Sequence, residues 1–577
     1  MNTKAHTELL SQSSESFWSK LKNGFLTYLN DKFYLISLLV TAIGSYYFLI
    51  TNYSISIDDL EGHRYLNGEL IAQGRISSSI INRIFQFPEN TVSIKDFLGM
   101  ILLCVGAIMF CMIFDRCIKT KNHIPQTVFS CLFVSYPLHS ELFSYTGCFL
   151  SVSIGCILNA LSILFIMDFF EKKKFRYLLY PVPCLMVIAS WYESILLIYV
   201  QIVFAILIFR QMSDSKLKLG GVIGKGLIYA APLAVATGLE YVVSTAVRLS
   251  LHLEKSIHAA TDLSQRYSRD GTLIENVLGY INTLASRLVL SFLNYMPIQL
   301  FIFASALFFV LILIITVKKR KLGIFLCGTG LFLSNFIISM ILSNVLTFRT
   351  CQSFSYFVAF TFFLLIILIC KAAERNNSQP LNIIYKTICI LSAVLIAIQV
   401  NTISDYFTTD WIRYEYEKMI LDDVGKELIK NYDLSKPVIF VGELEMSDEV
   451  TARASKAPNP LIYNVLIKVP GLKAKFDKFE IYNCTDPVKI QFTNAQSYLR
   501  WARHSFNQEP IIHFLEFIGF SGIKNGTEEQ IDEVNSLVNN DLPSWPKEGY
   551  ITETDKYIIV KLGEIIPEET ETQNQNN

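Results

Sequence analysis

Charged residues are scarce in this chain: Asp, Glu, Lys and Arg make up 17% of its 577 residues, whereas a soluble protein has roughly 25%. Hydrophobic residues make up 52%. Acidic and basic residues balance to a formal net charge of zero, which argues against nucleic acid as a partner. Most of the chain is therefore expected to lie in a lipid bilayer.

Three signals of other protein classes are absent. The cysteines have neither the spacing of a disulfide framework nor that of a zinc site, so small core residues are predicted. No small-residue cleavage site follows the first apolar run, which begins near Phe33, so no cleavable signal peptide is expected. No internal repeat of the kind that transporters often carry is evident.

The chain does contain a series of apolar runs, and a helix that crosses a bilayer needs about 20 apolar residues. The third and fifth runs are short and contain proline, which is typical of a broken or tilted helix. The predicted fold class is a polytopic α-helical membrane protein with about 11 transmembrane helices. The candidate spans lie at about 33–53, 97–114, 124–138, 147–170, 177–191, 194–210, 220–246, 296–317, 322–343, 353–370 and 383–403.

Basic residues occur in alternate loops between these spans, and the short loops around 139–146, 191–193 and 345–352 hold almost none apart from Arg349. Because cytoplasmic loops carry the excess of Lys and Arg, the N-terminus is predicted to be cytoplasmic and the region after the last span extracytoplasmic. Residues 1–32 then form a cytoplasmic segment. Within it, 17–29 alternate aromatic and basic residues, which fits either an interfacial helix or an ordinary surface helix.

After residue 403 the composition becomes that of a soluble protein. Residues 438–442 and 557–562 predict buried strands, and 495–506 and 528–538 predict helices. We therefore expect a small extracytoplasmic α/β domain over 404–566. The acidic, amide-rich residues 567–577 predict a disordered tail.

Polar residues gather at the predicted outer ends of the spans. A charged side chain at the centre of a bilayer costs roughly 3 kcal/mol, so polar groups collected at one depth are typical of a site at the membrane surface. The candidates are Asp58, Asp59, Glu61, Arg64, Arg75, Glu141, Tyr192, Glu193 and Arg349.

Such a set suits sugar transfer from a lipid-linked phosphate. The phosphate leaves as a stable anion, so one carboxylate base is enough, and such a base contributes about 10²–10⁴-fold in rate. Adjacent Asp58 and Asp59 raise each other's pKa, which favours a base role for one of them without indicating which. Arginines bind phosphate bidentately. The doublet also fits a solvated turn, and Arg349 also fits a snorkelling anchor.

Several short motifs also resemble those of a known family. They are Asp58-Asp59 with Arg64, Gly74-Arg75, Trp191-Tyr192-Glu193-Ser194, Phe348-Arg349-Thr350, the strand at 436–442 and the ending at 542–562. In order and placement they resemble the Gtr-type (glucosyl transferase II) O-antigen glucosyltransferases of the GT-C superfamily. Ile76 and Glu193 depart from the family pattern, which often has an aromatic residue and Gln there, so donor or acceptor specificity is open.

The resemblance implies a GT-C-like catalytic domain over 33–403 in the bacterial inner membrane. It implies a polyprenyl-phosphate glucose donor, made and flipped outward by partner membrane proteins, and a surface polysaccharide acceptor such as the O-antigen of lipopolysaccharide, with serotype conversion as the result. It also implies an acidic base in the first outer loop.

We therefore predict a membrane glycosyltransferase with Asp58 or Asp59 as base and Glu61 near the acceptor. Arg64, Arg75 and Arg349 are assigned to the donor phosphate or sugar, and Glu141, Tyr192 and Glu193 to sugar hydroxyls. No ligand spacing demands a divalent metal, although carboxylates near Asp58 are compatible with one. The alternatives are a transporter or flippase of lipid-linked sugars, and a glycan polymerase or ligase.

Overall fold

The computed structural model describes most of the chain, and its residues fall into two compact units that divide after Ser404, within helix α22 (Gln379–Asn431). The second unit also takes in the described residues Asn52, Ser54, Ile55, Ser144 and Tyr145. The described residues are 16–52, 54–55, 70–72, 74–85, 92–118, 120, 122–145, 148–253, 284, 288, 295–338, 348–376, 378–444, 497, 499, 502, 505–538 and 541–565.

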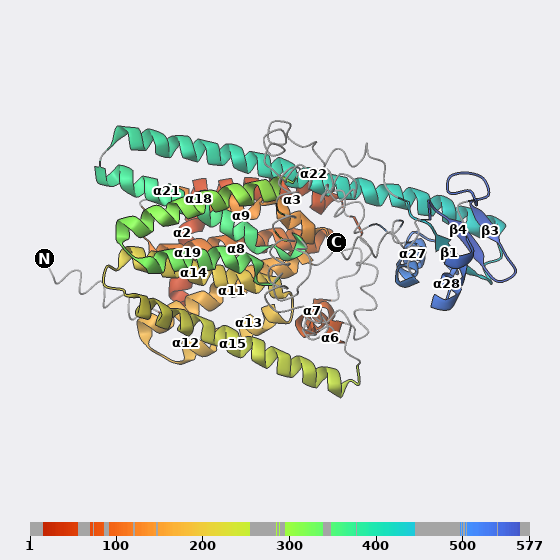
Figure 1. Cartoon of the computed structure of the whole chain (residues 1–577), viewed down its shortest axis with the longest axis horizontal. Helices are drawn as coiled ribbons and strands as arrows, with labels where there is room; N and C mark the ends of the chain where they lie inside the picture. The colour runs from red at the N-terminus through yellow and green to blue at the C-terminus, as the bar shows by residue number, and fades with distance from the viewer. Residues whose placement is uncertain are drawn as a thin grey trace, which may run out of the picture. The chain divides into compact units, whose positions relative to one another are not determined.

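The first unit is a bundle of helices (Figure 1). In chain order it contains α2 (Phe17–Asn30), α3 (Lys32–Thr51), α6 (Leu70–Ala72), α7 (Ile76–Phe85), α8 (Val92–Cys117), α9 (Ile124–Val134), α10 (Ser140–Phe143), α11 (Cys148–Lys172), α12 (Arg176–Leu179), α13 (Pro181–Ala189), α14 (Leu196–Ser213), α15 (Leu219–Ser250), α18 (Met296–Lys319), α19 (Leu322–Leu333) and α21 (Ser353–Asn376), with the 3-10 helices η3 (Pro137–His139), η4 (Glu193–Ile195), η5 (Ser334–Phe336) and η6 (Phe348–Thr350).

Among the described residues, 8 helices are long and apolar enough to cross a membrane. They are α3, α8, α11, α14, α15, α18, α21 and α22. The predicted helical, membrane-embedded character is therefore confirmed, whereas the count of about 11 spans stays a prediction.

The three remaining predicted spans coincide with shorter helices: α9, the apolar helix Arg176–Ala189 that α12 and α13 form together, and α19. The helix over Arg176–Ala189 rises roughly 21 Å, less than the ~30 Å hydrocarbon core of a bilayer. A 3-10 helix follows each of the three within a few residues: η3 after α9, η4 after α13 and η5 after α19. Polar residues therefore lie where a full-length span would continue.

Small residues and aromatic rings let the bundle pack closely. Helix α8 lies against α11, and a Cβ added at Gly106 would come within 3.0 Å of the Cys156 Cβ, so the absence of a side chain permits this approach. The Phe114 and Phe363 rings stack with centroids 4.4 Å apart, which joins α8 to α21.

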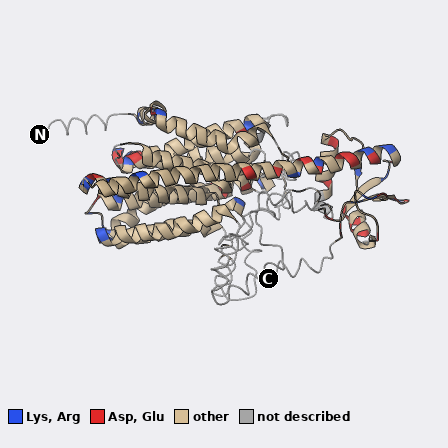
Figure 2. Cartoon of the chain, turned by 90° about the horizontal axis from the view of Figure 1, so that it is seen from above, with Lys and Arg blue, Asp and Glu red and all other residues tan. Residues whose placement is uncertain are grey.

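Charged residues of the bundle gather at helix ends, and the lengths of the helices are apolar (Figure 2). At the end of α11, buried Asp168 accepts hydrogen bonds from Arg116 Nη1 at 2.8 Å and from Lys172 Nζ at 2.7 Å. Helix α2 docks at this end, where Phe17 stacks on Phe165 and Lys20 pairs with Glu171 at 2.6 Å. Its interfacial role stays a prediction.

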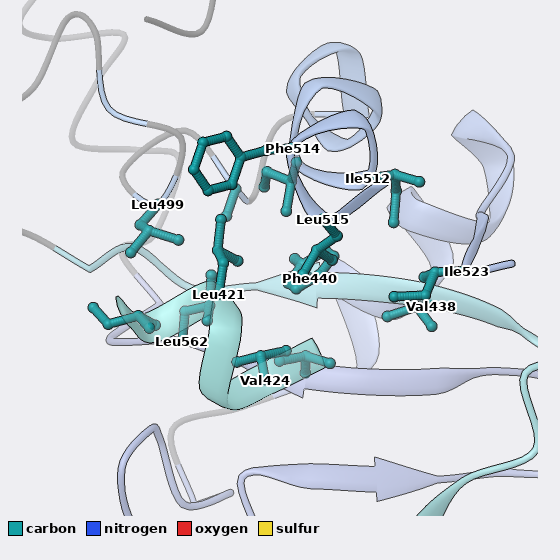
Figure 3. Packing of buried hydrophobic residues seen from close by; sticks show 14 of the residues in the cluster. Leu421, Val424, Val438, Phe440, Leu499, Ile512, Phe514, Leu515, Ile523 and Leu562 are labelled. Atoms are coloured by element: carbon teal, nitrogen blue, oxygen red, sulfur yellow. The ribbon is translucent and has the colours of Figure 1, made fainter. Parts of the chain in front are cut away.

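The second unit contains a four-stranded sheet in the order β2-β1-β4-β3. The strands are β1 (Pro437–Val441), β2 (Lys524–Asn525), β3 (Ile551–Glu553) and β4 (Ile558–Lys561); β1 runs parallel to β2 and β4, and β3 is antiparallel to β4. The core side chains of Val438 and Phe440 pack against Leu515 of helix α27 (Ser505–Phe517) and against Leu421 and Val424 of α22 (Figure 3).

Two of the predicted C-terminal elements coincide closely with observed ones: β1 with 438–442 and β4 with 557–562. Helix α28 (Glu528–Leu537) coincides with 528–538, and its N-terminus is closed by a capping box at Thr527. The helix predicted at 495–506 is wrong, because the described residues Ser497, Leu499 and Ala502 are not helical. Helix α27 instead begins at Ser505 and includes Pro510. Because proline is disfavoured in helix interiors, the sequence around Pro510 does not predict a helix. The tail at 567–577 lies outside the described residues.

Candidate functional site

Several helices of the first unit end together, at the end of α11 away from Asp168. Helix α10 and η3 both contact η6, and η5 lies against α14. Gln201 Nε2 of α14 donates to Asn335 Oδ1 of η5 at 2.8 Å, and Ser353 Oγ at the start of α21 donates to the same oxygen at 3.1 Å. The polar 3-10 segments are therefore held between the ends of the helices.

Glu141 is a fully buried carboxyl in this region. Tyr295, which precedes α18, donates its hydroxyl to Glu141 Oε1, and the Tyr295 ring lies 5.1 Å from that of Phe348. Burial raises the pKa of Glu141 from 4.5 to about 8, and nearby Arg349 opposes part of this shift. At neutral pH the carboxyl is thus mostly protonated and can both donate and accept hydrogen bonds.

His139 lies two residues before Glu141 and is also buried. Its Nδ1 is 2.8 Å from Gln352 Oε1, its Nε2 is 2.9 Å from the Phe133 carbonyl oxygen, and its ring stacks on Phe143. Burial lowers the pKa of His139 to about 4, so the imidazole is neutral near pH 7. The residue fixes the turn that carries Glu141.

Arg75 lies over the ring of Tyr192, with the guanidinium carbon 5.7 Å from the ring centroid. Gly74 permits this placement: its φ is +85°, and a Cβ there would lie 3.2 Å from Ser244 Oγ of α15. A hydrogen bond between the hydroxyls of Ser77 and Ser190 ties the start of α7 to the end of α13. The turn and the hydroxyl pair together hold Arg75 near Tyr192.

Arg349 also lies near Tyr192. Burial raises the pKa of the Tyr192 hydroxyl to about 12, while Arg349 and Arg75 both favour its ionised form. Arg349 itself is exposed, as is Glu193. Glu193 in turn lies close enough to half-buried Glu240 of α15 to act on it electrostatically. Arg75 thus lies on the Tyr192 ring, and Arg349, far away in the sequence, is close enough to act electrostatically on the Tyr192 hydroxyl and on Glu141.

Among the described residues, no group of three or more His, Cys, Asp or Glu side chains is placed to hold a metal ion. This part of the chain therefore offers arginines, aromatic rings and single carboxyls. Such a set binds anions and hydroxyl groups.

The model of the family described as glucosyl transferase GtrII matches residues 47–366. The chain belongs to the glucosyl transferase GtrII family. This confirms the family resemblance and supports a membrane glucosyltransferase. No curated protein and no solved structure matched the chain.

The GtrII match covers every predicted site residue, and the structure brings five of them together: Arg75, Glu141, Tyr192, Glu193 and Arg349. The other four lie outside the described residues: Asp58, Asp59, Glu61 and Arg64.

Tyr295 and Gln352 are not among the site residues predicted from the sequence, although each contacts a buried polar residue of this region. Their partners are 154 and 213 residues away in sequence, so no local pattern joins them. A tyrosine immediately before an apolar helix is a weak signal of a polar contact at that helix end.

Proposed function

We propose that this GtrII-family protein transfers glucose, or another hexose, from a polyprenyl-phosphate carrier to a surface polysaccharide such as O-antigen. The reaction takes place on the extracytoplasmic face of the bacterial inner membrane. The observation that carries the proposal is the contact of Arg75 with the Tyr192 ring, with Arg349 close enough to act on the Tyr192 hydroxyl, at the end of the bundle away from the Arg116–Asp168–Lys172 cluster.

The arginines supply the groups that a phosphate needs. Arg75 is partly exposed, and in the proposed reaction its N–H groups donate to the phosphate. A planar guanidinium donates two parallel hydrogen bonds to a phosphate and stabilises charge that grows as the phosphate leaves. Tyr192 holds the Arg75 guanidinium by a cation–π contact.

The sugar is assigned to the carboxyl groups beside the arginines. Protonated Glu141 can donate to one sugar hydroxyl, while exposed Glu193 can accept from another. Tyr295 fixes Glu141 by its hydrogen bond and so limits the orientations of the carboxyl.

The transfer step breaks one bond and forms one. The acceptor hydroxyl oxygen attacks the anomeric carbon of the sugar, and the bond from that carbon to the phosphate oxygen breaks. The polyprenyl phosphate keeps the bonding electrons and leaves as an anion. Asp58 or Asp59 takes the hydroxyl proton, with Glu61 near the acceptor and Arg64 near the phosphate. Membrane proteins that synthesise and flip the donor are required partners.

The mass of the surface polysaccharide repeat tests the proposal. Cells that express the protein should gain one hexose per repeat, and cells that express the double variant Asp58→Asn/Asp59→Asn should not. The adjacent doublet Asp422 and Asp423 on α22 offers a matched control, Asp422→Asn/Asp423→Asn, which should keep the gain. An equal gain from the Asp58/Asp59 variant would refute the assignment of the base, and no gain from the intact protein in cells that supply donor and acceptor would refute the function.

A further inference from the structure

The second unit contains a buried charged cluster centred on Arg413 of α22. The side chain of Arg413 is fully buried; its Nε lies 3.0 Å from Asp410 Oδ1 and its Nη1 lies 2.6 Å from Glu417 Oε2. These two contacts follow the helix, at positions i−3 and i+4. The third contact leaves the helix, because Nη2 donates to the carbonyl oxygen of Ile55 at 3.1 Å.

The carboxylates of the cluster also reach other segments. Asp410 accepts a hydrogen bond from the hydroxyl of Ser54, and Glu417 accepts one from the hydroxyl of Ser497. The Ile55 side chain is buried in the same core as Tyr414. The segment at 54–55 is thus bound to α22 by a backbone carbonyl, a hydroxyl and an apolar side chain, although some 356 residues separate it from Asp410.

Fold stability alone gives little reason for such a cluster. Replacing a buried ion-pair cluster with apolar residues of similar volume is often neutral or stabilising, since desolvation of the charges offsets their attraction. A buried charged network is better suited to fixing one geometry, and the geometry fixed here is that of the backbone at Ser54 and Ile55.

Asp58 follows Ile55 by three residues, so the length of the chain keeps its Cα within about 11 Å of the Ile55 Cα. We infer that Arg413, together with Asp410 and Ser54, is a positioning cluster that fixes the segment leading to the Asp58-Asp59 doublet. This inference rests on the proposed function, in which one of these aspartates is the base. Arg413 does not touch the substrate in this scheme and acts through the aspartates.

The test measures hexose transfer by the full-length protein in membranes, with a radiolabelled polyprenyl-phosphate hexose as donor. Ser54→Ala removes one hydroxyl of the tether, and Arg413→Lys keeps the charge but loses the forked contacts. Displacement of a catalytic group by about 1 Å can cost 10²-fold, so kcat should fall 10-fold or more in both variants. KM for the donor should stay within about twofold, because the arginines near Tyr192 are unchanged.

Tyr432→Phe is a matched control in the same unit, since it removes one hydroxyl that donates to the Ile551 carbonyl oxygen at 3.1 Å and leaves Ser54 untouched. It should keep the wild-type kcat. Amide hydrogen exchange at residues 52–55 should become faster in Ser54→Ala and in Arg413→Lys but not in Tyr432→Phe.

The outcomes separate the two proposals. An unchanged kcat in folded Ser54→Ala and Arg413→Lys would overturn the positioning role, as would an equal loss of kcat in Tyr432→Phe that follows melting temperature. Absence of transfer by the wild-type protein would overturn the proposed function and, with it, the positioning of its base. Unchanged exchange at 52–55 would show that the cluster does not hold this segment.

Discussion

Replacing Glu141 with Gln is expected to stabilise the helical unit increasingly as the pH rises above 4.5 and to leave it nearly unchanged near pH 4. The physical reason is the buried carboxyl, whose pKa rises from 4.5 to about 8 in the folded protein. Folded Glu141 therefore holds its proton where the unfolded chain has lost it. Its contribution to stability is complete below pH 4.5 and is lost as the pH rises through 8. Gln has the same shape, can still accept the Tyr295 hydrogen bond, and never ionises.

The two pKa values set the size of the effect. Between pH 6 and pH 9, the linkage relation gives a loss of about 2.7 kcal/mol from Glu141. At the usual unfolding entropy per residue, a unit of this size should lose roughly 3 °C in melting temperature from this group. The Gln variant lacks this loss.

The contribution of His139 to stability changes with pH in the opposite direction and must be distinguished from that of Glu141. Burial lowers its pKa to about 4, so its contribution to stability is complete above pH 6.5 and is lost as the pH falls through 4. Between pH 6 and pH 9 it adds only about 0.8 kcal/mol on going to higher pH. Because both the wild type and the Gln variant contain His139, this contribution cancels in their difference.

The assay is the melting temperature of the purified full-length protein in detergent, measured from pH 4 to pH 9. The wild-type and Glu141→Gln curves should converge near pH 4 and separate steadily above pH 4.5, with the variant more stable by about 2 kcal/mol at pH 6 and about 4.7 kcal/mol at pH 9. Glu193→Gln is the matched control, since Glu193 is exposed, and its curve should run parallel to that of the wild type. Parallel curves for Glu141→Gln, or a constant deficit at every pH, would refute the buried-carboxyl argument.

Three further predictions follow from the described contacts. Arg75→Lys should raise the donor KM about 10-fold with little change in kcat, measured with labelled donor, because Lys cannot make the bidentate contact; an unchanged KM would remove Arg75 from the phosphate site. Asp168→Ala should destabilise the bundle by roughly 1–3 kcal/mol in thermal unfolding, because it leaves the partly buried Arg116 and Lys172 without this carboxylate; a loss below ~0.5 kcal/mol would contradict this. Gly442→Ala should make the second unit sensitive to protease at lower temperature, since φ is +78° and the new Cβ would clash with the Gly563 carbonyl oxygen; wild-type resistance would contradict it.

The helices of the bundle could be predicted from sequence because each long apolar run has only one stable form in lipid. Their lengths were predicted less well where a polar 3-10 turn replaces the end of the helix. The span predicted at 124–138 is an α-helix only to Val134, and the one predicted at 322–343 only to Leu333. Hydropathy does not distinguish an α-helical turn from a 3-10 turn, because both keep the same residues.

The candidate site could be predicted only as a set of residues. Arg75, Tyr192 and Arg349 were chosen from short motifs, and the structure brings all three together. The burial of Glu141 and its bond to Tyr295 could not be predicted, since they depend on packing between helices that are distant in sequence. An exposed Glu141 was an equally good reading of the sequence.

The Arg413 cluster shows a different limit of prediction. Its helical half is visible in the sequence, because Asp410, Arg413 and Glu417 have the spacing of one helix face. Its other half is the Ser54 hydroxyl and the Ile55 backbone carbonyl. Because every residue type has a backbone carbonyl, the sequence does not indicate that the one at Ile55 accepts a hydrogen bond. Intrahelical pairs on an exposed face contribute little, so the spacing alone gave no reason to single out Arg413.

The boundary of the family match separates two parts of the proposed reaction. Arg75, Tyr192 and Arg349 all lie within residues 47–366, so the contacts assigned to the donor belong to the part that the chain shares with the GtrII family. Arg413 lies beyond that match, yet it holds residues that lie within it, just before Asp58. In the proposed reaction, a change at Arg413 should therefore alter the rate of transfer without altering how tightly the carrier phosphate is held.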